Sequence, residues 1–220
     1  HINVSDARAM DDILQLVSND IVMQGLSPDT DIIVMSPMRN GAIGVVRCNN
    51  AIKNAINPIT DDPTTHPFEL AESGTELTIN DVVMNLENND TIQVMNGECG
   101  IVSSFTKVPE VNKEGNPTGR MLDTPVVDFG SGDVIFPPDK LHKLAIANAG
   151  TVHKNQGSEN TIAIMVIPSH AAHMTSKNLF FTGLTRGKIG AYIVGSAESL
   201  MKAVNNISAT NRYTGLKHKL

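Results

Sequence analysis

The residues best suited to chemistry on a charged ligand lie in two polar clusters of this sequence, at 151–159 and 181–188. The first reads T-V-H-K-N-Q-G-S-E and the second reads F-T-G-L-T-R-G-K. Donor side chains beside a glycine can hold a phosphate together with backbone N–H groups. The first cluster supplies such positions at Thr151, His153, Lys154 and Gly157. The second supplies Arg186, a cation able to stabilise the charge that develops on a phosphoryl group during transfer.

Residue types alone leave a structural explanation open for each cluster. Residues 151–159 could be a solvated helix start in which the glycine and serine form a turn. Arg186 could be a surface cation near a helix C-terminus, where the helix dipole favours positive charge. Within the first cluster, Gln156 and Glu159 could hydrogen-bond either a nucleotide or a facing domain.

An apolar run at 162–167 separates the two clusters and predicts a buried parallel strand, with the clusters at the ends of this sheet element. Apolar residues at helical spacing alternate with further apolar runs, a pattern typical of an α/β layer. The predicted helices are 6–24, 41–56, 176–185 and 197–206, and the predicted strands are 31–36, 161–167 and 189–194. The α/β pattern stops near residue 61 and resumes at 144–147.

Residues 61–141 are punctuated by proline and glycine, which predicts short strands joined by turns. The predicted strands are 82–84, 92–95, 99–102, 125–129 and 133–136. Asn96-Gly97 predicts a tight hairpin turn, 130–132 predicts a second hairpin, and 109–123 predicts a long exposed loop. The pattern indicates a small antiparallel barrel inserted into an α/β domain. The predicted domains are 1–65 together with 143–220 for the α/β domain, and 66–142 for the insert.

The composition of the 220 residues is globular, with 40% apolar and 18% charged residues. A net charge of −6 argues against nucleic-acid binding by bulk positive charge, although it allows a narrow DNA track lined by a few polar groups. The distant Cys48 and Cys99 indicate reduced thiols in a cytoplasmic protein. No apolar run reaches the ~18 residues of a membrane span, so no membrane partner is expected.

The order and spacing of the two clusters, with the apolar strand between them, resemble motifs V and VI of superfamily 1 DNA helicases, and most of all the RecD-like branch. Residues 36–44 are similar to the S-P-M-R-x-G-x-x-G segment of that branch. Residues 80–84 and 94–102 are similar to its G-D-x-V-M and N-G-x-x-G segments, and 1–3 resemble the segment just after motif IV.

This resemblance covers nearly the whole chain and implies the C-terminal portion of a longer helicase. The implied fold is α/β: a RecA-like, P-loop NTPase-type parallel sheet domain (2A) that lacks the P-loop itself, with an inserted SH3-like β-barrel (2B). The implied activity is ATP-driven 5′-to-3′ translocation on single-stranded DNA, with ATP bound between this domain and a first RecA-like domain of the same protein.

The resemblance also implies roles for individual residues. Arg186 would be the catalytic finger, and Gly157 and Glu159 would bind the nucleotide beside it. Gln156 would couple the nucleotide site to DNA. The DNA-binding residues would be Thr151, His153, Lys154, Ser36, Arg39 and Asn40.

The sequence departs from the family pattern at four positions. Asn155 replaces a usual serine, and its side chain is expected to point outward with little effect. Asn80 replaces a usual glycine, which suggests a slightly different turn. Gly183 and Gly187 stand where the family often has alanine, and two glycines in the last helical turns are expected to loosen Arg186.

Motifs for nucleotide hydrolysis and for metal binding are absent from the sequence. It contains no G-x-x-x-x-G-K-[ST] and no apolar strand that ends in an Asp-Glu pair for Mg²⁺. The resemblance implies ATP and Mg²⁺ as cofactors of the intact protein, held with the help of a first RecA-like domain, and this chain alone is expected to be inactive. No metal ligands are predicted, because acidic or cysteine partners at ligand spacing are missing around His66, His142, His170 and His173.

The expected partners are single-stranded DNA, the N-terminal RecA-like domain, and recombination or repair subunits. Two alternatives remain open. The chain could be a stand-alone DNA- or protein-binding module, in which case a longer product carrying the P-loop would be missing. It could also be the helicase part of a conjugative relaxase, which an upstream nuclease domain with tyrosine and histidine would reveal.

Overall fold

The computed structural model describes residues 2–3, 5–20, 22, 25–27, 30–60, 68–70, 75–112, 114, 116–155 and 159–207. The chain divides into two compact units: unit 1 is 1–48 with 149–220, and unit 2 is 49–148. These boundaries differ from the predicted ones for two local reasons. Residues 49–56 of α2 (Val45–Ile56) belong to unit 2, where Lys53 pairs with Asp81. Strand β9 (Leu144–Ile146) pairs antiparallel with β5 (Val82–Asn85) instead of resuming the α/β pattern.

Unit 1 contains a five-stranded parallel sheet with the strand order β1-β12-β11-β2-β10. The strands are β1 (Ile2–Asn3), β2 (Ile32–Met35), β10 (Ala149–Gly150), β11 (Asn160–Ile167) and β12 (Gly187–Gly195). Residues 162–167 of β11 are all buried, as expected for a central parallel strand covered on both faces. The α/β character predicted for this part of the chain is confirmed.

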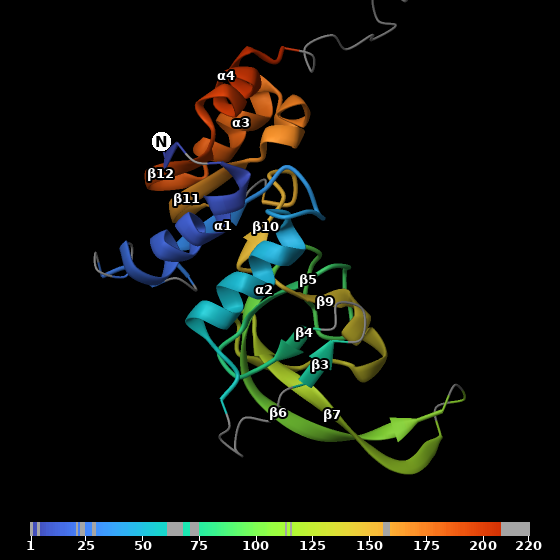
Figure 1. The fold of residues 1–220 in the computed structure, drawn as a ribbon. Helices are drawn as coiled ribbons and strands as arrows, with labels where there is room; N and C mark the ends of the chain where they lie inside the picture. The colour runs from blue at the N-terminus through green and yellow to red at the C-terminus, as the bar shows by residue number, and fades with distance from the viewer. Residues whose placement is uncertain are drawn as a thin grey trace, which may run out of the picture. The chain divides into compact units, whose positions relative to one another are not determined.

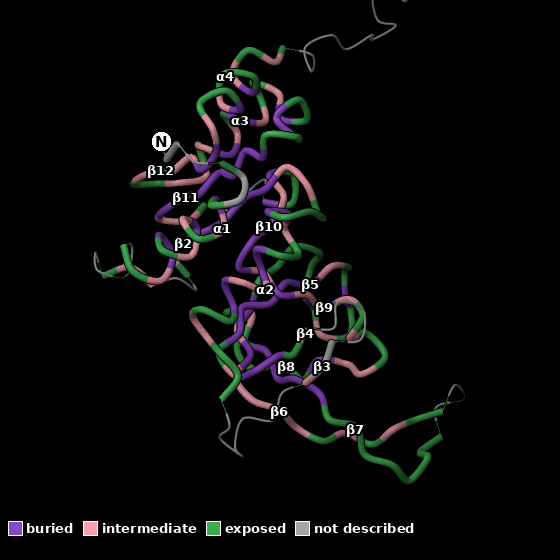
Figure 2. Tube along the Cα trace, viewed as in Figure 1, coloured by how far each residue is buried: buried purple, intermediate pink, exposed green. Residues whose placement is uncertain are grey.

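Helices cover the sheet of unit 1 on both faces (Figure 1). The helical segments are α1 (Asp6–Gln15), the π-helical turn η1 (Leu16–Asp20), the 3-10 turn η4 (Ser169–Met174), α3 (Lys177–Leu184) and α4 (Ala197–Asn205). Met35 and Met165 point to one face, where they share a core with Phe180 of α3 and Ala203 of α4. Helix α1 contacts β12 and lies on the other side of the sheet in Figure 1. Figure 2 shows the buried strands between these layers.

Unit 2 contains a five-stranded antiparallel sheet with the order β8-β7-β6-β5-β9, and a separate two-stranded hairpin. The further elements are β3 (Phe68–Leu70), β4 (Thr75–Leu77), β6 (Cys99–Val111), β7 (Pro117–Asp128), β8 (Asp133–Ile135) and the 3-10 helix η3 (Pro138–Lys143). Its core is a separate cluster around Leu77, Val102 and Phe136.

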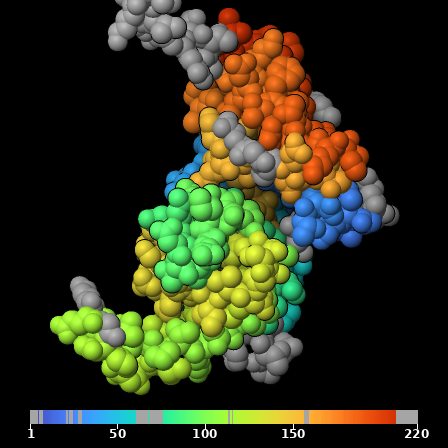
Figure 3. Space-filling view, turned by 180° about the vertical axis from the view of Figure 1, so that it is seen from behind, coloured from blue at the N-terminus to red at the C-terminus, as the bar shows by residue number. Residues whose placement is uncertain are grey.

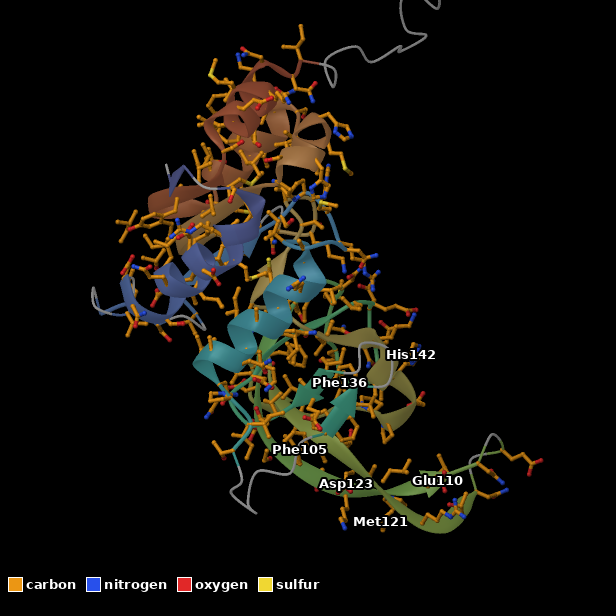
Figure 4. All side chains as sticks on the ribbon, viewed as in Figure 1. Phe105, Glu110, Met121, Asp123, Phe136 and His142 are labelled. Atoms are coloured by element: carbon orange, nitrogen blue, oxygen red, sulfur yellow. The ribbon has the colours of Figure 1, made fainter. Side chains whose placement is uncertain are left out.

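The predicted exposed loop at 109–123 is instead a β-hairpin. Strands β6 and β7 stay paired from Lys107↔Asp123 out to Val111↔Pro117. They form a two-stranded arm that carries Glu110, Met121 and Asp123 (Figure 4) and stands clear of the rest of unit 2 (Figure 3). None of the described side chains of the arm is buried. The arm therefore lacks the alternation of buried and exposed residues by which a strand is recognised in a sequence.

The predicted strand at 92–95 is wrong, because these residues form a turn closed by a single bridge between Asn89 and Val94. The Asn85 side chain explains the turn: its Nδ2 donates to the carbonyl oxygens of Val94 (3.1 Å) and Met95 (3.2 Å). Asn96-Gly97 does form a turn, but not the predicted hairpin, because residues 92–95 before it do not form a strand. Asn80 adopts φ +72°, so asparagine here takes the left-handed conformation in which glycine is favoured.

Both cysteines are free thiols, and burial raises the pKa of Cys48 to about 11. Within the ranges given above, no group of three or more His, Cys, Asp or Glu side chains could hold a metal ion. No helix in the described part of the chain is long and apolar enough to cross a membrane.

Candidate functional site

Two segments that follow neighbouring strands begin side by side at the carboxyl edge of the unit 1 sheet. Strands β2 and β10 pair in parallel, and the N–H of Ser36 donates to the Gly150 carbonyl oxygen at 3.1 Å. The chain continues from these points into the loop 36–44 and into the turn that starts at Thr151. Two of the predicted DNA-binding segments therefore share one edge of the sheet.

The loop 36–44 is closed by its own hydrogen bonds. Ser36 is 0% exposed, and its hydroxyl donates to the Ile43 carbonyl oxygen at 2.9 Å. Such burial does not suit a direct DNA contact for Ser36, which instead shapes the loop. Arg39 and Asn40 are exposed at its tip.

A glycine at the end of this loop allows the close packing that holds its tip. A Cβ at Gly44 would lie 2.5 Å from the carbonyl carbon and oxygen of Asn40. The N–H of Val46 donates to the Arg39 carbonyl oxygen at 3.1 Å, so the loop returns directly into α2. The backbone of Arg39 and Asn40 is thereby fixed while their side chains face solvent.

The turn 151–155 has two exposed residues between two buried ones. Val152 is buried in the core of unit 1, and Asn155 is only 3% exposed. His153 and Lys154 lie between these two anchors and are exposed. The expectation that Asn155 points outward is wrong, because the missing side chain of Gly150 leaves a space that the Asn155 amide occupies.

The second cluster returns to the amino end of β11, where the first cluster ends. The N–H of Asn160 donates to the Arg186 carbonyl oxygen at 2.9 Å, and Asn160 pairs with Gly187 in the sheet register. On the surface, Lys188 Nζ lies 3.9 Å from Glu159 Oε2. Both clusters therefore meet at one end of this strand, and not at its two ends.

Helix α3 sets the position of Arg186. The hydroxyl of Ser176 caps the helix by accepting from the Leu179 N–H at 3.2 Å. At the other end, Arg186 is partly exposed and its Nε donates to the Thr182 carbonyl oxygen at 3.2 Å. The guanidinium is therefore anchored at the junction between α3 and β12.

The predicted site residues thus fall into two groups at opposite edges of one sheet. Arg39, Asn40 and the turn from Thr151 lie at the carboxyl edge, whereas Glu159 and Arg186 lie at the amino edge. The four residues of β2 separate the edges by about 13 Å at 3.3 Å per residue. Residues 151–159 connect the two edges. Gln156 and Gly157, predicted for coupling and nucleotide binding, lie outside the described residues.

Comparison with known proteins connects this arrangement to helicases. Residues 147–194 match the family described as UvrD-like helicase C-terminal domain. The ATP-dependent RecD2 DNA helicase of Deinococcus radiodurans is 30% identical over 168 residues, which cover 76% of this chain and 20% of that protein. The RecBCD enzyme subunit RecD of Mycobacterium tuberculosis is 25% identical over 182 residues, covering 83% of this chain and 27% of the subunit.

The chain therefore has homologues among the RecD and RecD2 helicases. It spans between a fifth and a third of the length of these two relatives. A solved structure of Bacteroides Pif1 bound to single-stranded DNA has the same fold, with a TM-score of 0.50 at 16% identity over 95% of this chain and 50% of that one. A structure of Pif1 helicases on forked DNA gives the same TM-score at 17% identity, over 94% and 48% of the two chains.

The amino edge of this RecD homologue contains one carboxylate that the sequence reasoning missed. Asp31 accepts hydrogen bonds from the Thr161 hydroxyl (2.6 Å) and the Ser27 N–H (2.9 Å). These two hydrogen bonds hold the pKa of Asp31 below its ordinary value, and the bond from Thr161 has the larger effect. Asp31 thereby ties the start of β2 to the start of β11. The signal in the sequence is a polar residue directly before each apolar strand.

Both glycines of the second cluster lie in tightly packed places, and only one of them is in the helix where both were expected to loosen Arg186. Gly187 is not helical but begins β12, and a Cβ there would overlap the Gly190 carbonyl oxygen and lie 3.0 Å from the Ala163 nitrogen. Gly183 is buried against β11, where a Cβ would lie 2.9 Å from Met165 Sδ.

Gly187→Ala is expected to lower the free energy of unfolding by about 1–3 kcal/mol, because backbone atoms block the added Cβ. Gly190→Ala is the matched control in the same strand, since its Cβ would meet only the end of the Ile162 side chain, at 3.4 Å. Urea unfolding followed by circular dichroism measures both. Equal stability of the two variants would contradict the packing assigned to Gly187.

Proposed function

We propose that this chain is the second motor domain (2A) of an ATP-dependent helicase that moves 5′-to-3′ along single-stranded DNA. The observation that carries the proposal is the division of its motif residues between two edges of one parallel sheet. Residues 151–159 run from one edge to the other, so a change at the nucleotide edge can be transmitted along a short, continuous segment to the DNA edge. Gln156, within that segment, is the proposed coupling residue.

DNA is proposed to bind at the carboxyl edge. Arg39, His153 and Lys154 are exposed there and can pair with phosphates, and Asn40 can donate hydrogen bonds to the DNA backbone. Because the chain has a net charge of −6, binding should rest on these few contacts and not on a broad basic surface. Thr151 is assigned a backbone contact at the start of the same turn, and its Oγ1 already accepts from the Lys154 N–H at 3.4 Å.

The nucleotide is proposed to bind at the amino edge. The Glu159 carboxylate can accept hydrogen bonds from the hydroxyl groups of a ribose, and the Arg186 guanidinium can donate to the oxygens of a phosphoryl group, so these two side chains fit ATP. Arg186 would stabilise charge on the phosphoryl oxygens as the bond to the leaving group breaks. We assign the phosphate-binding loop and the Mg²⁺ ligands to a first RecA-like domain, and expect no ATP hydrolysis from these 220 residues alone.

Unit 2 is proposed to be the inserted SH3-like domain (2B) of such a helicase. Its small five-stranded antiparallel sheet supports this assignment, as does its place in the sequence, between the two stretches that make up unit 1. Because one relative is named as a subunit of the RecBCD enzyme, assembly with recombination or repair subunits belongs to the same proposal.

Lys154→Ala and Arg39→Ala are each expected to weaken binding of the intact protein to a fluorescent single-stranded oligonucleotide. Each lost phosphate contact should also reduce the slope of log affinity against log salt by about 0.7. Fluorescence anisotropy over a range of salt concentrations measures both quantities.

Lys202→Ala is the matched control, since Lys202 is an exposed cation of α4 that pairs with Glu198 on the same helix. It should leave the affinity and the salt slope unchanged. If Lys154→Ala and Arg39→Ala behave like Lys202→Ala, DNA does not bind at the carboxyl edge and the proposal is wrong.

A further inference from the structure

We propose that Asn155 is a positioning residue that holds His153 and Lys154 toward DNA phosphates, and that Gly150 provides the space in which it does so. The proposal rests on the function proposed above. It assigns a role to Asn155, one of the four positions at which this chain departs from the family pattern. The argument depends on the buried side of the turn 151–155.

Asn155 closes this turn with two hydrogen bonds to one acceptor. Its backbone N–H donates to the Thr151 carbonyl oxygen at 3.2 Å, and its side-chain Nδ2 donates to the same oxygen at 3.0 Å. A carbonyl oxygen has two lone pairs, so both bonds can form together. The turn is therefore closed by a side-chain bond in addition to the backbone bond that any residue other than proline would make.

Gly150 determines whether the Asn155 amide can take this position. A Cβ at Gly150 would overlap Asn155 Nδ2 and would lie 3.2 Å from Asn155 Cγ. Gly150 also belongs to β10 and pairs with Met35, so the sheet prevents it from moving aside. Asn155 and Gly150 are thus complementary in shape, and neither position can be enlarged without displacing the turn.

The consequence is that two exposed residues lie between two buried anchors. Val152 is fixed in the core at one side, and Asn155 is fixed over Gly150 at the other. His153 and Lys154 have little freedom other than that of their own side chains. Residues that follow Asn155 lead to Glu159 at the amino edge, so the same anchor also sets where the connecting segment departs.

A double-mutant cycle tests this arrangement through DNA binding. Asn155→Ser removes the amide, Gly150→Ala adds the blocking Cβ, and the double variant combines a shorter side chain with that Cβ. In the intact protein, each single change should weaken affinity for a fluorescent single-stranded oligonucleotide by about tenfold, within the usual range for residues in contact. The double variant should bind no more weakly than either single variant, because serine leaves room for the Cβ.

Thermal unfolding distinguishes a role of Asn155 in positioning the DNA-binding residues from a role in stability alone. All affinities are measured well below the lowest melting temperature, and Asn155→Ser supplies the test by itself if Gly150→Ala does not fold. A lower melting temperature with unchanged DNA affinity, or additive effects in the cycle, would overturn the role of Asn155. Lys154→Ala is measured alongside. If Lys154→Ala also leaves the affinity unchanged, DNA does not bind at the carboxyl edge, and the proposed function is wrong together with the role of Asn155.

Discussion

Arg186→Ala is expected to lower ATP turnover by the intact protein about a thousandfold or more, with little change in affinity for single-stranded DNA. The side chain is anchored at the α3–β12 junction through Thr182, on the edge of the sheet opposite to the proposed DNA residues. Its loss would remove a fixed positive charge from the transferring phosphoryl group without altering the carboxyl edge. Steady-state ATPase measurements with and without single-stranded DNA determine the turnover.

Lys177→Ala is the control for this experiment, because Lys177 is an exposed cation at the opposite end of the same helix. It should hydrolyse ATP at nearly the original rate. Normal turnover by Arg186→Ala would show that the arginine has no catalytic role. Absence of ATPase activity from the unmodified intact protein would instead favour a DNA- or protein-binding module.

Asp81→Ala is expected to lower the free energy of unfolding of unit 2 by about 3–5 kcal/mol. The Lys53 and Asp81 side chains are 2% and 1% exposed, with 3.2 Å between Lys53 Nζ and Asp81 Oδ2. Without Asp81, the ammonium would retain only the Thr78 hydroxyl (3.2 Å) and the Asn57 carbonyl (3.3 Å) as neutral acceptors. A buried charge left in this way is strongly destabilising.

Lys53→Met should cost less than Asp81→Ala, which gives the prediction its control. The carboxylate of Asp81 would keep the donors Thr78 N (2.7 Å), Thr78 Oγ1 (3.2 Å) and Asn57 Nδ2 (2.8 Å). The double variant should be more stable than Asp81→Ala, because it contains no buried charge. Urea unfolding measures the free energy of unfolding of all three variants. A cost below about 1 kcal/mol for Asp81→Ala would contradict the role assigned to the pair.

The elements of unit 1 were predictable because their sequence signals are local. The apolar run at 162–167 is a strand, and the predicted helices at 176–185 and 197–206 correspond to α3 and α4 within one residue at each end. The relation to RecD-like helicases was predictable because the order of residue types in two short motifs is specific.

Features that depend on tertiary contacts were not predictable in the same way. The direction of the Asn155 side chain depends on the absence of a Cβ at Gly150, which residue types in the motif do not reveal. Residues 49–56 of α2 belong to unit 2, where Lys53 pairs with Asp81, a residue 28 positions away in the sequence. The exposed arm of β6 and β7 lacks the alternation that marks a half-buried strand.

Whether DNA and nucleotide act at opposite edges of the unit 1 sheet is tested most directly by titrating the ATPase of the intact protein with single-stranded DNA. Arg186→Lys keeps a charge but loses the planar guanidinium, and Lys154→Ala removes one proposed phosphate contact. Arg186→Lys should lower the maximal turnover at an unchanged half-saturating DNA concentration. Lys154→Ala should raise that concentration while the maximal turnover stays near its original value. If both variants change the same parameter, the two edges do not have separate roles.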